Sequence, residues 1–219
     1  MTEDTLFAPV PPVTVPVQGE SSVFPVRRVF CVGRNYAAHA AEMGTKADKE
    51  DPFYFTKTAL AIVPSGATIA YPPGTENYHY EMELVAAIGA PAFQVGLDDA
   101  LACVFGYACG LDMTRRDLQL VAREKGRPWD LGKDFEESAV ISPIVPASVC
   151  GHISRGAISL SVNGEVKQNA DVAELINSVP EILVHLSRFY HLEPGDLIYT
   201  GTPAGVGPDV SENKITNTI

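Results

Sequence analysis

Two glutamates, Glu81 and Glu83, interrupt the apolar stretch YHYEMELVAAIG (78–89), which otherwise has the composition of a buried strand. Side chains two residues apart on a strand share a face, so the two carboxylates would point the same way. Buried together they would repel each other and raise each other's pKa unless a cation lay between them. The alternative is a half-exposed strand whose solvent face carries an ordinary E-x-E pair.

A third acid, Asp112, ends the apolar segment GYACGLD (106–112), where a chain that leaves a strand can direct a carboxylate into a cavity. Three carboxylates without a cysteine are the hard oxygen ligands that Mg²⁺, Mn²⁺ or Ca²⁺ prefer, and they disfavour zinc. His79 has the same strand parity as the glutamates, so it is either a neighbour of the site, which we favour, or a further ligand that would shift the preference toward a transition metal. No spacing rule connects Glu83 with Asp112. The residues alone therefore allow two interpretations, a metal site or a half-exposed strand with acids on its solvent face.

His39 and Glu42 are three residues apart in NYAAHAAEMG (35–44), a segment of good helix formers. On a helix they share a face, where a carboxylate can orient an imidazole and raise its basicity, as in a general base. The alternative is an exposed pair of small energetic value. Gly33, Gly44 and the polar loop that follows favour a mobile lid over a substrate.

Several polar residues further along the chain have the chemistry to receive an anion. Arg116 and Gln119 share a helix face just after Asp112, and Lys133 lies in the apolar WDLGKDF (129–135). Such cations can hold carboxylates or a developing oxyanion, although each alone is more often a surface residue. The turn TGTPAGVG (200–207) offers backbone N–H groups and the hydroxyls of Thr200 and Thr202.

These residues require a framework of strands with a few helices, which is an α+β pattern with strands dominant. Asn163-Gly164 between alternating residues predicts a type I′ hairpin over 158–168, and Ser178 with Glu181 forms a capping box that starts the last helix. Further strands are predicted over 26–33, 53–63, 106–112 and from 197, and the second of these has a polar break. Helices are predicted over 98–105 and 115–126, and Thr114 is the predicted N-cap of the second helix.

Composition limits the class of protein. A chain of 219 residues with 46% hydrophobic content fits one domain, and we predict an extended Pro- and Val-rich arm over 1–25 and a single catalytic domain over 26–219. The net charge of −11 argues against nucleic acid as a partner. No stretch resembles a signal peptide or a membrane helix, and the four cysteines lack C-x-x-C spacing, so we expect a soluble cytoplasmic protein with the thiols as core residues.

The motifs, taken in order, resemble the fumarylacetoacetate hydrolase family, and most of all its short members that act on acylpyruvates such as fumarylpyruvate. The resemblance runs from about Val29 to Pro208 and is carried by the segments GRNYAAHAAEMG, YHYEMELVAAIG, GYACGLDMTRRDLQ, KGRPWDLGKDF and LEPGDLIYTGTPAGVG.

The resemblance implies a mixed β-sandwich roll with peripheral helices, usually dimeric. It implies a Mg²⁺ or Mn²⁺ site with His79 not a ligand, a catalytic dyad on a lid, and a pocket for a small anionic keto acid. The implied metal ligands are Glu81, Glu83 and Asp112; the implied catalytic residues are His39, Glu42 and Lys133; and the implied substrate-binding residues are Arg116, Gln119 and Thr202. Family members usually continue past the T-G-T-P turn with further strands of the roll, whereas this chain continues with the polar segment 209–219.

The expected reaction is metal-dependent hydrolysis of the C–C bond of an acylpyruvate, giving pyruvate and a carboxylic acid, in the catabolism of aromatic compounds. The same site also suits oxaloacetate decarboxylation, isomerisation of a hydroxy-diene dioate or dehydration of a sugar acid. A metal-stabilised binding protein without turnover is the alternative from a different class, and the His39–Glu42 pair argues against it.

Overall fold

A computed structural model describes residues 5–44, 49–209 and 213–219 of the chain. Its centre is an eight-stranded mixed sheet with the order β4-β3-β14-β7-β8-β10-β5, in which β11 also pairs with β8. The strands of this sheet are β3 (Arg28–Gly33), β4 (Phe53–Lys57), β5 (Ile62–Pro64), β7 (Met82–Ile88), β8 (Val104–Asp112), β10 (Ala139–Ile141), β11 (Val145–Pro146) and β14 (Asp196–Tyr199).

Smaller sheets flank the central one. They comprise the pair β1 (Thr14–Pro16) and β2 (Val23–Pro25), the set β12 (Ala157–Val162), β13 (Glu165–Asp171) and β16 (Ile215–Thr218), and the set β6 (Tyr78–Tyr80), β9 (Thr114–Arg115) and β15 (Gly207–Pro208).

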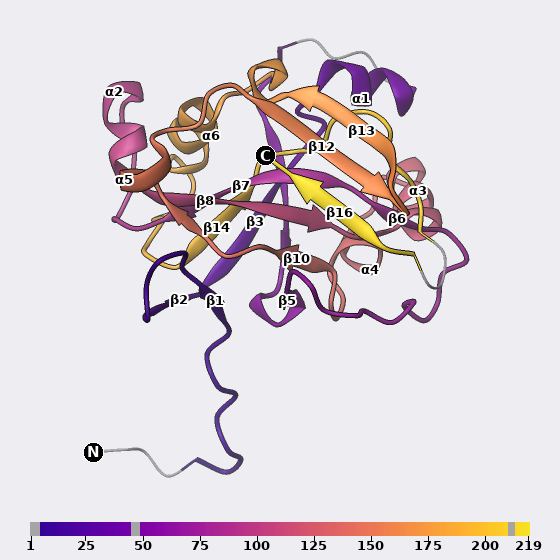
Figure 1. The fold of residues 1–219 in the computed structure, drawn as a ribbon, viewed down its shortest axis with the longest axis horizontal. Coiled ribbons are helices and arrows are strands. Elements are labelled where there is room, and N and C mark those ends of the chain that lie inside the picture. Colours follow the sequence, from indigo (N-terminus) through magenta and orange to yellow (C-terminus); the bar gives the residue numbers. More distant parts are fainter. Residues whose placement is uncertain (1–4, 45–48, 210–212) are drawn as a thin grey trace.

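Short helices lie at the periphery (Figure 1). They are α1 (Ala37–Glu42), α2 (Leu97–Ala100), α3 (Arg116–Glu124), α4 (Asp130–Lys133), α5 (Ala147–Cys150) and α6 (Val179–Leu186), with 3₁₀ turns η1 (Ala59–Ala61), η2 (Leu101–Cys103) and η3 (Val172–Glu174). In the part of the chain that the structure describes, no helix has the length and apolar character needed to cross a membrane.

The central sheet is curled into a roll. Its edge strands β4 and β5 lie at opposite ends of the strand order, yet only Thr58 and the turn η1 separate Lys57 from Ile62 in the chain. A five-residue step reaches at most about 18 Å, so the two edges must come close together. The segment 53–63, predicted as one strand with a polar break, therefore forms two strands at opposite edges.

Strand β7 is buried on both faces, which explains why its sequence is apolar except for Glu83. Met82, Leu84 and Ala86 face a core shared with β12 and with α6. Val85 and Ala87 belong to a second core on the opposite side, which includes Val15 and Phe24 from the β1–β2 hairpin. The α+β roll expected from the sequence is confirmed, with its two layers packed on either side of β7.

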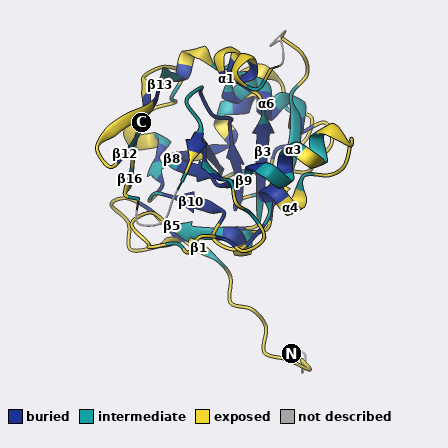
Figure 2. Ribbon diagram, turned by 90° about the vertical axis from the view of Figure 1, so that its right-hand side faces the viewer, coloured by how far each residue is buried: buried dark blue, intermediate teal, exposed yellow. Residues whose placement is uncertain are grey.

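The N-terminal segment consists of a projecting tail followed by a hairpin that packs on the body. Residues from Thr14 to Pro25 form the β1–β2 hairpin, and its inward side chains pack on the second core. Residues 5–12 project from the body as an exposed tail (Figure 1 and Figure 2).

Two local predictions have clear outcomes. Asn163 and Gly164 have φ of 52° and 85°, the left-handed values of the predicted type I′ turn between β12 and β13. Thr114 is not the cap of α3, because the N-cap is Arg115 and Thr114 belongs to β9, where its hydroxyl donates to the Asp112 carbonyl.

The segment 209–219, in which no strand was predicted, includes β16, which pairs with β12.

Candidate active site

One cavity, with a volume of about 30 Å³, is lined by eight of the nine residues for which the sequence analysis predicted a role. They are His39, Glu81, Glu83, Asp112, Arg116, Gln119, Lys133 and Thr202. The ninth, Glu42, does not line the cavity but is 3.1 Å from the His39 ring through its Oε2. The roll thus gathers side chains from five distant parts of the chain.

The three acids are brought together by strand pairing. Glu83 lies on β7 opposite Gly110 of β8, and the Asp112 backbone N–H donates to the Glu81 carbonyl at 2.9 Å. One oxygen from each acid lies within 4.8 Å of the others, and all three side chains are buried. The antiparallel register supplies the connection between Glu83 and Asp112 that no sequence spacing indicates.

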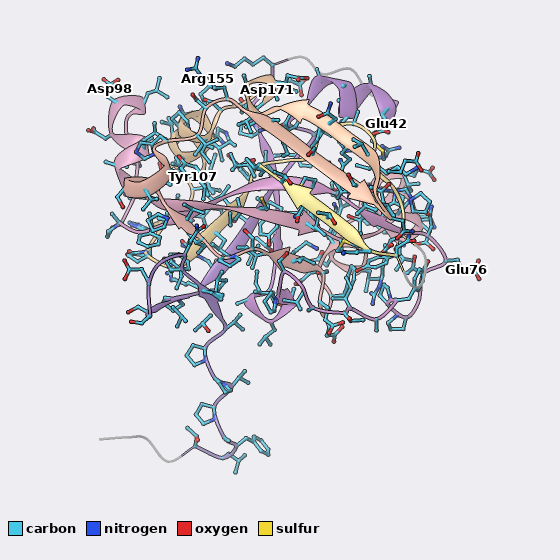
Figure 3. The ribbon with its side chains drawn as sticks, viewed as in Figure 1. Glu42, Glu76, Asp98, Tyr107, Arg155 and Asp171 are labelled. Atoms are coloured by element: carbon cyan, nitrogen blue, oxygen red, sulfur yellow. The ribbon has the colours of Figure 1, made fainter. Side chains whose placement is uncertain are left out.

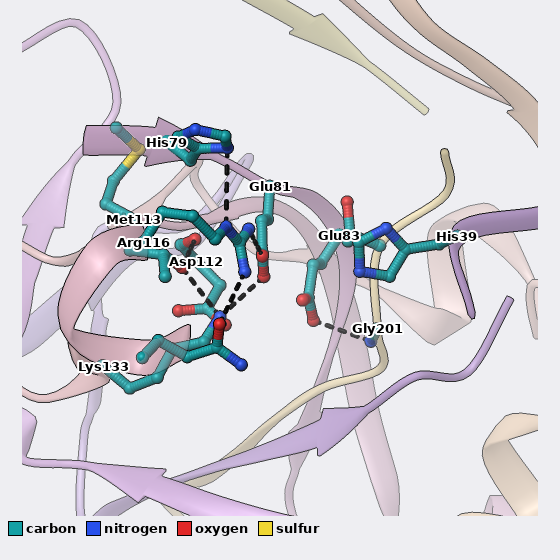
Figure 4. A network of polar contacts seen from close by, with 12 residues as sticks. His39, His79, Glu81, Glu83, Asp112, Met113, Arg116, Lys133 and Gly201 are labelled. Atoms are coloured by element: carbon teal, nitrogen blue, oxygen red, sulfur yellow. Dashed lines mark hydrogen bonds and ion pairs between the residues drawn. The ribbon is translucent and has the colours of Figure 1, made fainter. Parts of the chain in front are cut away.

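Two of these acids are engaged by buried cations (Figure 4). Lys133 Nζ lies 2.7 Å from Glu81 Oε2 and 2.6 Å from Asp112 Oδ2. The Arg116 guanidinium donates to the other oxygen of Glu81, and Lys57 Nζ is 2.9 Å from Asp112 Oδ1. Burial raises the pKa of Glu81, but the charges of Lys133 and Arg116 outweigh that effect and hold it well below its usual range.

Glu83 differs from the other two acids because no described cation pairs with it. Its Oε2 accepts a 2.7 Å hydrogen bond from the Gly201 backbone N–H (Figure 4). Burial, followed by the negative charges of Asp112 and Glu81, raises the pKa of Glu83 well above its usual range. A buried acid in this position is a site where a further cation would be stabilised.

The donor set fits a divalent ion such as Mg²⁺ or Mn²⁺. Each carboxylate oxygen has two lone pairs, so the oxygens of Glu81 and Asp112 that bind lysine can still coordinate a metal. The charges of the three acids are balanced by Lys57, Lys133 and Arg116, and a divalent ion would make this cluster positive. Such a cluster would attract a substrate that carries carboxylates.

His39 and Glu42 lie on α1 above the cavity. His39 is buried, whereas Glu42 is exposed and accepts a hydrogen bond from the Gly205 N–H at 3.1 Å. This contact fastens the helix to the glycine turn that also provides Gly201. The same C-terminal end of α1 is also held by Arg123, whose Nη1 donates to the Met43 carbonyl at 3.2 Å. These two contacts hold α1 in the position where His39 lines the same cavity as the acids.

The predicted substrate-binding residues lie on two walls of the cavity. Arg116 and Gln119 begin α3, and the Arg116 Nη1 donates to Gln119 Oε1 at 3.2 Å. Thr202 follows β14, and its hydroxyl accepts from Gln168 Nε2 at 2.9 Å. His79 stays outside the cavity lining, and its Nε2 lies 2.8 Å from Asn77 Oδ1. Burial and the Arg116 charge lower the pKa of His79 to about 4.

Sequence analysis missed two buried residues that support the site. Lys57 contacts Asp112, and it also donates to the Met113 and Lys133 carbonyls and to the Ser138 hydroxyl. Gln168 accepts from the Met82 N–H through its Oε1 while its amide group holds Thr202. A lysine inside the aromatic strand FYFTK was the available signal for Lys57, whereas nothing in the hairpin sequence indicated Gln168.

The roll, the buried acid triad and the overlying histidine define a metal-assisted enzyme class, and comparisons with known proteins identify its family. The profile of the fumarylacetoacetate (FAA) hydrolase C-terminal family matches residues 28–217. The chain belongs to this family.

Individual relatives differ in the reaction named for them. A fumarylpyruvate hydrolase from Ralstonia sp is 59% identical over 179 residues, which are 81% of this chain and 93% of the relative. The mitochondrial oxaloacetate tautomerase of Homo sapiens is 41% identical, covering 85% of this chain and 84% of the relative. The crystal structure of Pseudomonas aeruginosa fumarylpyruvate hydrolase in complex with Mn²⁺ and pyruvate has 53% identity and a TM-score of 0.95, covering 98% of this chain and 94% of that chain.

Proposed function

We propose that this protein is a metal-dependent hydrolase that cleaves the C–C bond of fumarylpyruvate or a closely similar acylpyruvate, giving pyruvate and a carboxylic acid. The observation that carries the proposal is the cavity lined by both the acid triad and His39, whose ring Glu42 contacts from outside the cavity. The 59% identity to a fumarylpyruvate hydrolase and the 53% identity to one that binds Mn²⁺ and pyruvate support it.

Glu81, Glu83 and Asp112 would hold the ion, with Mg²⁺ or Mn²⁺ as the cofactor. When bound, the ion supplies Lewis acidity and a template for the adjacent carboxylate and keto oxygens of the substrate. Arg116 and Gln119 bind the pyruvyl carboxylate, because both line the cavity beside Glu81. Thr202 lines the cavity beyond Glu83 and offers its hydroxyl to the substrate.

Hydrolysis requires a water molecule to add to the distal carbonyl carbon. His39 accepts a proton from that water, and Glu42 orients the ring and stabilises its positive charge. The tetrahedral adduct then collapses, the C–C bond breaks, and its electron pair passes to the pyruvyl fragment as an enolate. Lys133 stabilises the negative charge, and the proton taken by His39 returns to carbon, so that water and acylpyruvate yield pyruvate and an acid.

Pyruvate release from a substrate panel tests this proposal. We expect kcat/KM to be highest for fumarylpyruvate and lower for other acylpyruvates and for oxaloacetate, all assayed with Mg²⁺. Higher activity on oxaloacetate would instead favour a decarboxylase, or a tautomerase like the relatives at 37–41% identity, and conversion of a hydroxy-diene dioate would favour an isomerase. Absence of turnover on every compound, with metal bound, would favour a metal-stabilised binding protein.

Further features of the protein are part of the proposal. We place it in the cytoplasm, in the catabolism of aromatic compounds, with Mg²⁺ as its usual ion and neither nucleic acid nor membrane as a partner. The net charge of −11 supports the absence of nucleic-acid binding. We keep residues 1–25 as an N-terminal segment and 26–219 as one catalytic domain, and limited proteolysis that cut within 26–219 first would contradict this division.

We expect a homodimer in solution. Leu6, Phe7 and Val10 on the projecting tail are 90%, 80% and 68% exposed, and their apolar surface would be buried against a second subunit. Light scattering at micromolar concentration should give twice the chain mass. A monomer mass across that range would contradict the expectation.

A further inference from the structure

A second and wider cavity, of about 560 Å³, adjoins the cavity of the acid triad. The residues that line both are Arg34, Phe55, Arg123, Trp129 and Lys133. The triad cavity itself, at about 30 Å³, is much smaller than its neighbour. A substrate bound at the acids can therefore extend an acyl arm of several atoms into the wider cavity.

Aromatic rings form one wall of the wide cavity. Phe53 packs edge-on against Trp129 with centroids 5.4 Å apart, and Phe55 is 5.8 Å from the same indole. The Arg34 guanidinium carbon lies 4.8 Å from the centre of the Phe53 ring. Flat walls of this kind suit a planar conjugated chain, and a guanidinium that lies over an aromatic ring can still donate hydrogen bonds through its N–H groups.

The charged groups of the wide cavity are mostly positive. Among the described residues that line it, the cations are Arg34, Arg123, Arg127 and Lys133, and the acid is Asp130. Lys133 is already paired with Glu81 and Asp112. By contrast, no ion pair within the described residues involves Arg34 or Arg123, although both reach the boundary between the two cavities.

We propose that Arg34 and Arg123 bind a second carboxylate at the far end of the substrate's acyl arm, and that they select dianionic acylpyruvates over neutral-armed ones. This inference rests on the proposed function, because it assumes that the pyruvyl end lies at Glu81, Glu83 and Asp112. The two arginines would be specificity-determining residues, remote from the bond that breaks. Paired guanidinium groups match a carboxylate through planar N–H donors, and a site built to hold a charged group discriminates against an analogue that lacks it.

Arg34 is the better position for a test, because Arg123 also holds the end of α1 through the Met43 carbonyl. Arg34 is exposed, and its backbone has a φ of 52°. Replacing it with glutamine retains a Cβ in the same backbone conformation, so Arg34→Gln removes the guanidinium without adding a new type of backbone strain. Arg155, at the upper edge of the molecule in Figure 3, is exposed and lines neither cavity, so Arg155→Gln is a control with the same change of net charge.

The experiment compares kcat/KM for fumarylpyruvate and for its terminal monoamide, which has the same shape without the distal charge. We expect Arg34→Gln to lower the ratio of the two values by on the order of 10- to 100-fold, as for loss of a hydrogen bond to a charged group, mainly through KM for the dianion. Arg123→Gln should lower the ratio in the same direction, whereas Arg155→Gln should leave it unchanged.

The outcomes separate this inference from the proposed function. Unchanged ratios in both the Arg34 and the Arg123 variants, with wild-type protein active on fumarylpyruvate, would overturn the carboxylate receptor while the hydrolase function stood. A fall in the ratio for Arg155→Gln as large as that for Arg34→Gln would also overturn it, because general electrostatic attraction would then explain the preference. Failure of the wild-type protein to hydrolyse either compound would instead remove the proposed function itself.

Discussion

Excess EDTA is expected to abolish pyruvate release, with a loss of about 10³-fold or more, and added Mg²⁺ or Mn²⁺ should restore it. Glu81, Glu83 and Asp112 are buried within 4.8 Å of one another and offer oxygen ligands alone. The Lewis acidity of such an ion contributes several kcal/mol to transition-state stabilisation, and Lys133, which is engaged by two of the acids, cannot replace it. A coupled assay of pyruvate before and after chelation and re-addition measures the loss.

Glu83→Gln provides a matched test of where the ion binds. The amide oxygen can still accept the Gly201 N–H bond, so the fold should be retained while a charged ligand is lost. We expect weaker metal affinity in a calorimetric titration, and no change for Glu165→Gln, where the glutamate forms an exposed surface pair with Lys167. Full turnover in excess EDTA, or an unchanged titration for Glu83→Gln, would contradict the metal site.

The parts of the site that the sequence predicted are those with a short-range pattern. Glu81 and Glu83 are separated by one residue, and His39 and Glu42 by one helical turn, so periodicity alone places each pair on one face. The capping box of Ser178 and Glu181 is equally local, and the helix α6 begins there. The meeting of these pairs in one cavity depended on family resemblance, because it requires strand pairing between distant segments.

The missed and wrong predictions are non-local. Lys57 comes from the edge strand β4, and it reaches Asp112 only because the roll curls until that strand lies beside the end of β8. Thr114 has a residue type that commonly caps helices, but pairing of β9 with β6 competes for it, and its hydroxyl binds Lys133 instead. In both cases contacts between distant segments decide the position of the residue, and these contacts cannot be read from a single sequence.

His39→Ala is expected to lower kcat by on the order of 10²- to 10⁴-fold, the usual contribution of a general base. His39 lines the cavity and has Glu42 at its Nδ1, so its other ring nitrogen is available to a water molecule. The ring makes no bond to the three acids among the described contacts, so metal affinity and the unfolding transition should be nearly unchanged. His191→Ala, an exposed histidine that stacks on Phe93, should leave kcat unchanged.

Glu42→Gln should give a smaller loss, because the amide still bonds to the ring but no longer stabilises its charge. Two results would contradict the assignment. If His39→Ala weakened metal binding as strongly as turnover, the histidine would be a ligand or a structural residue. If it changed neither, α1 would carry no catalytic base, and the attacking water would have to be activated at the acid triad instead.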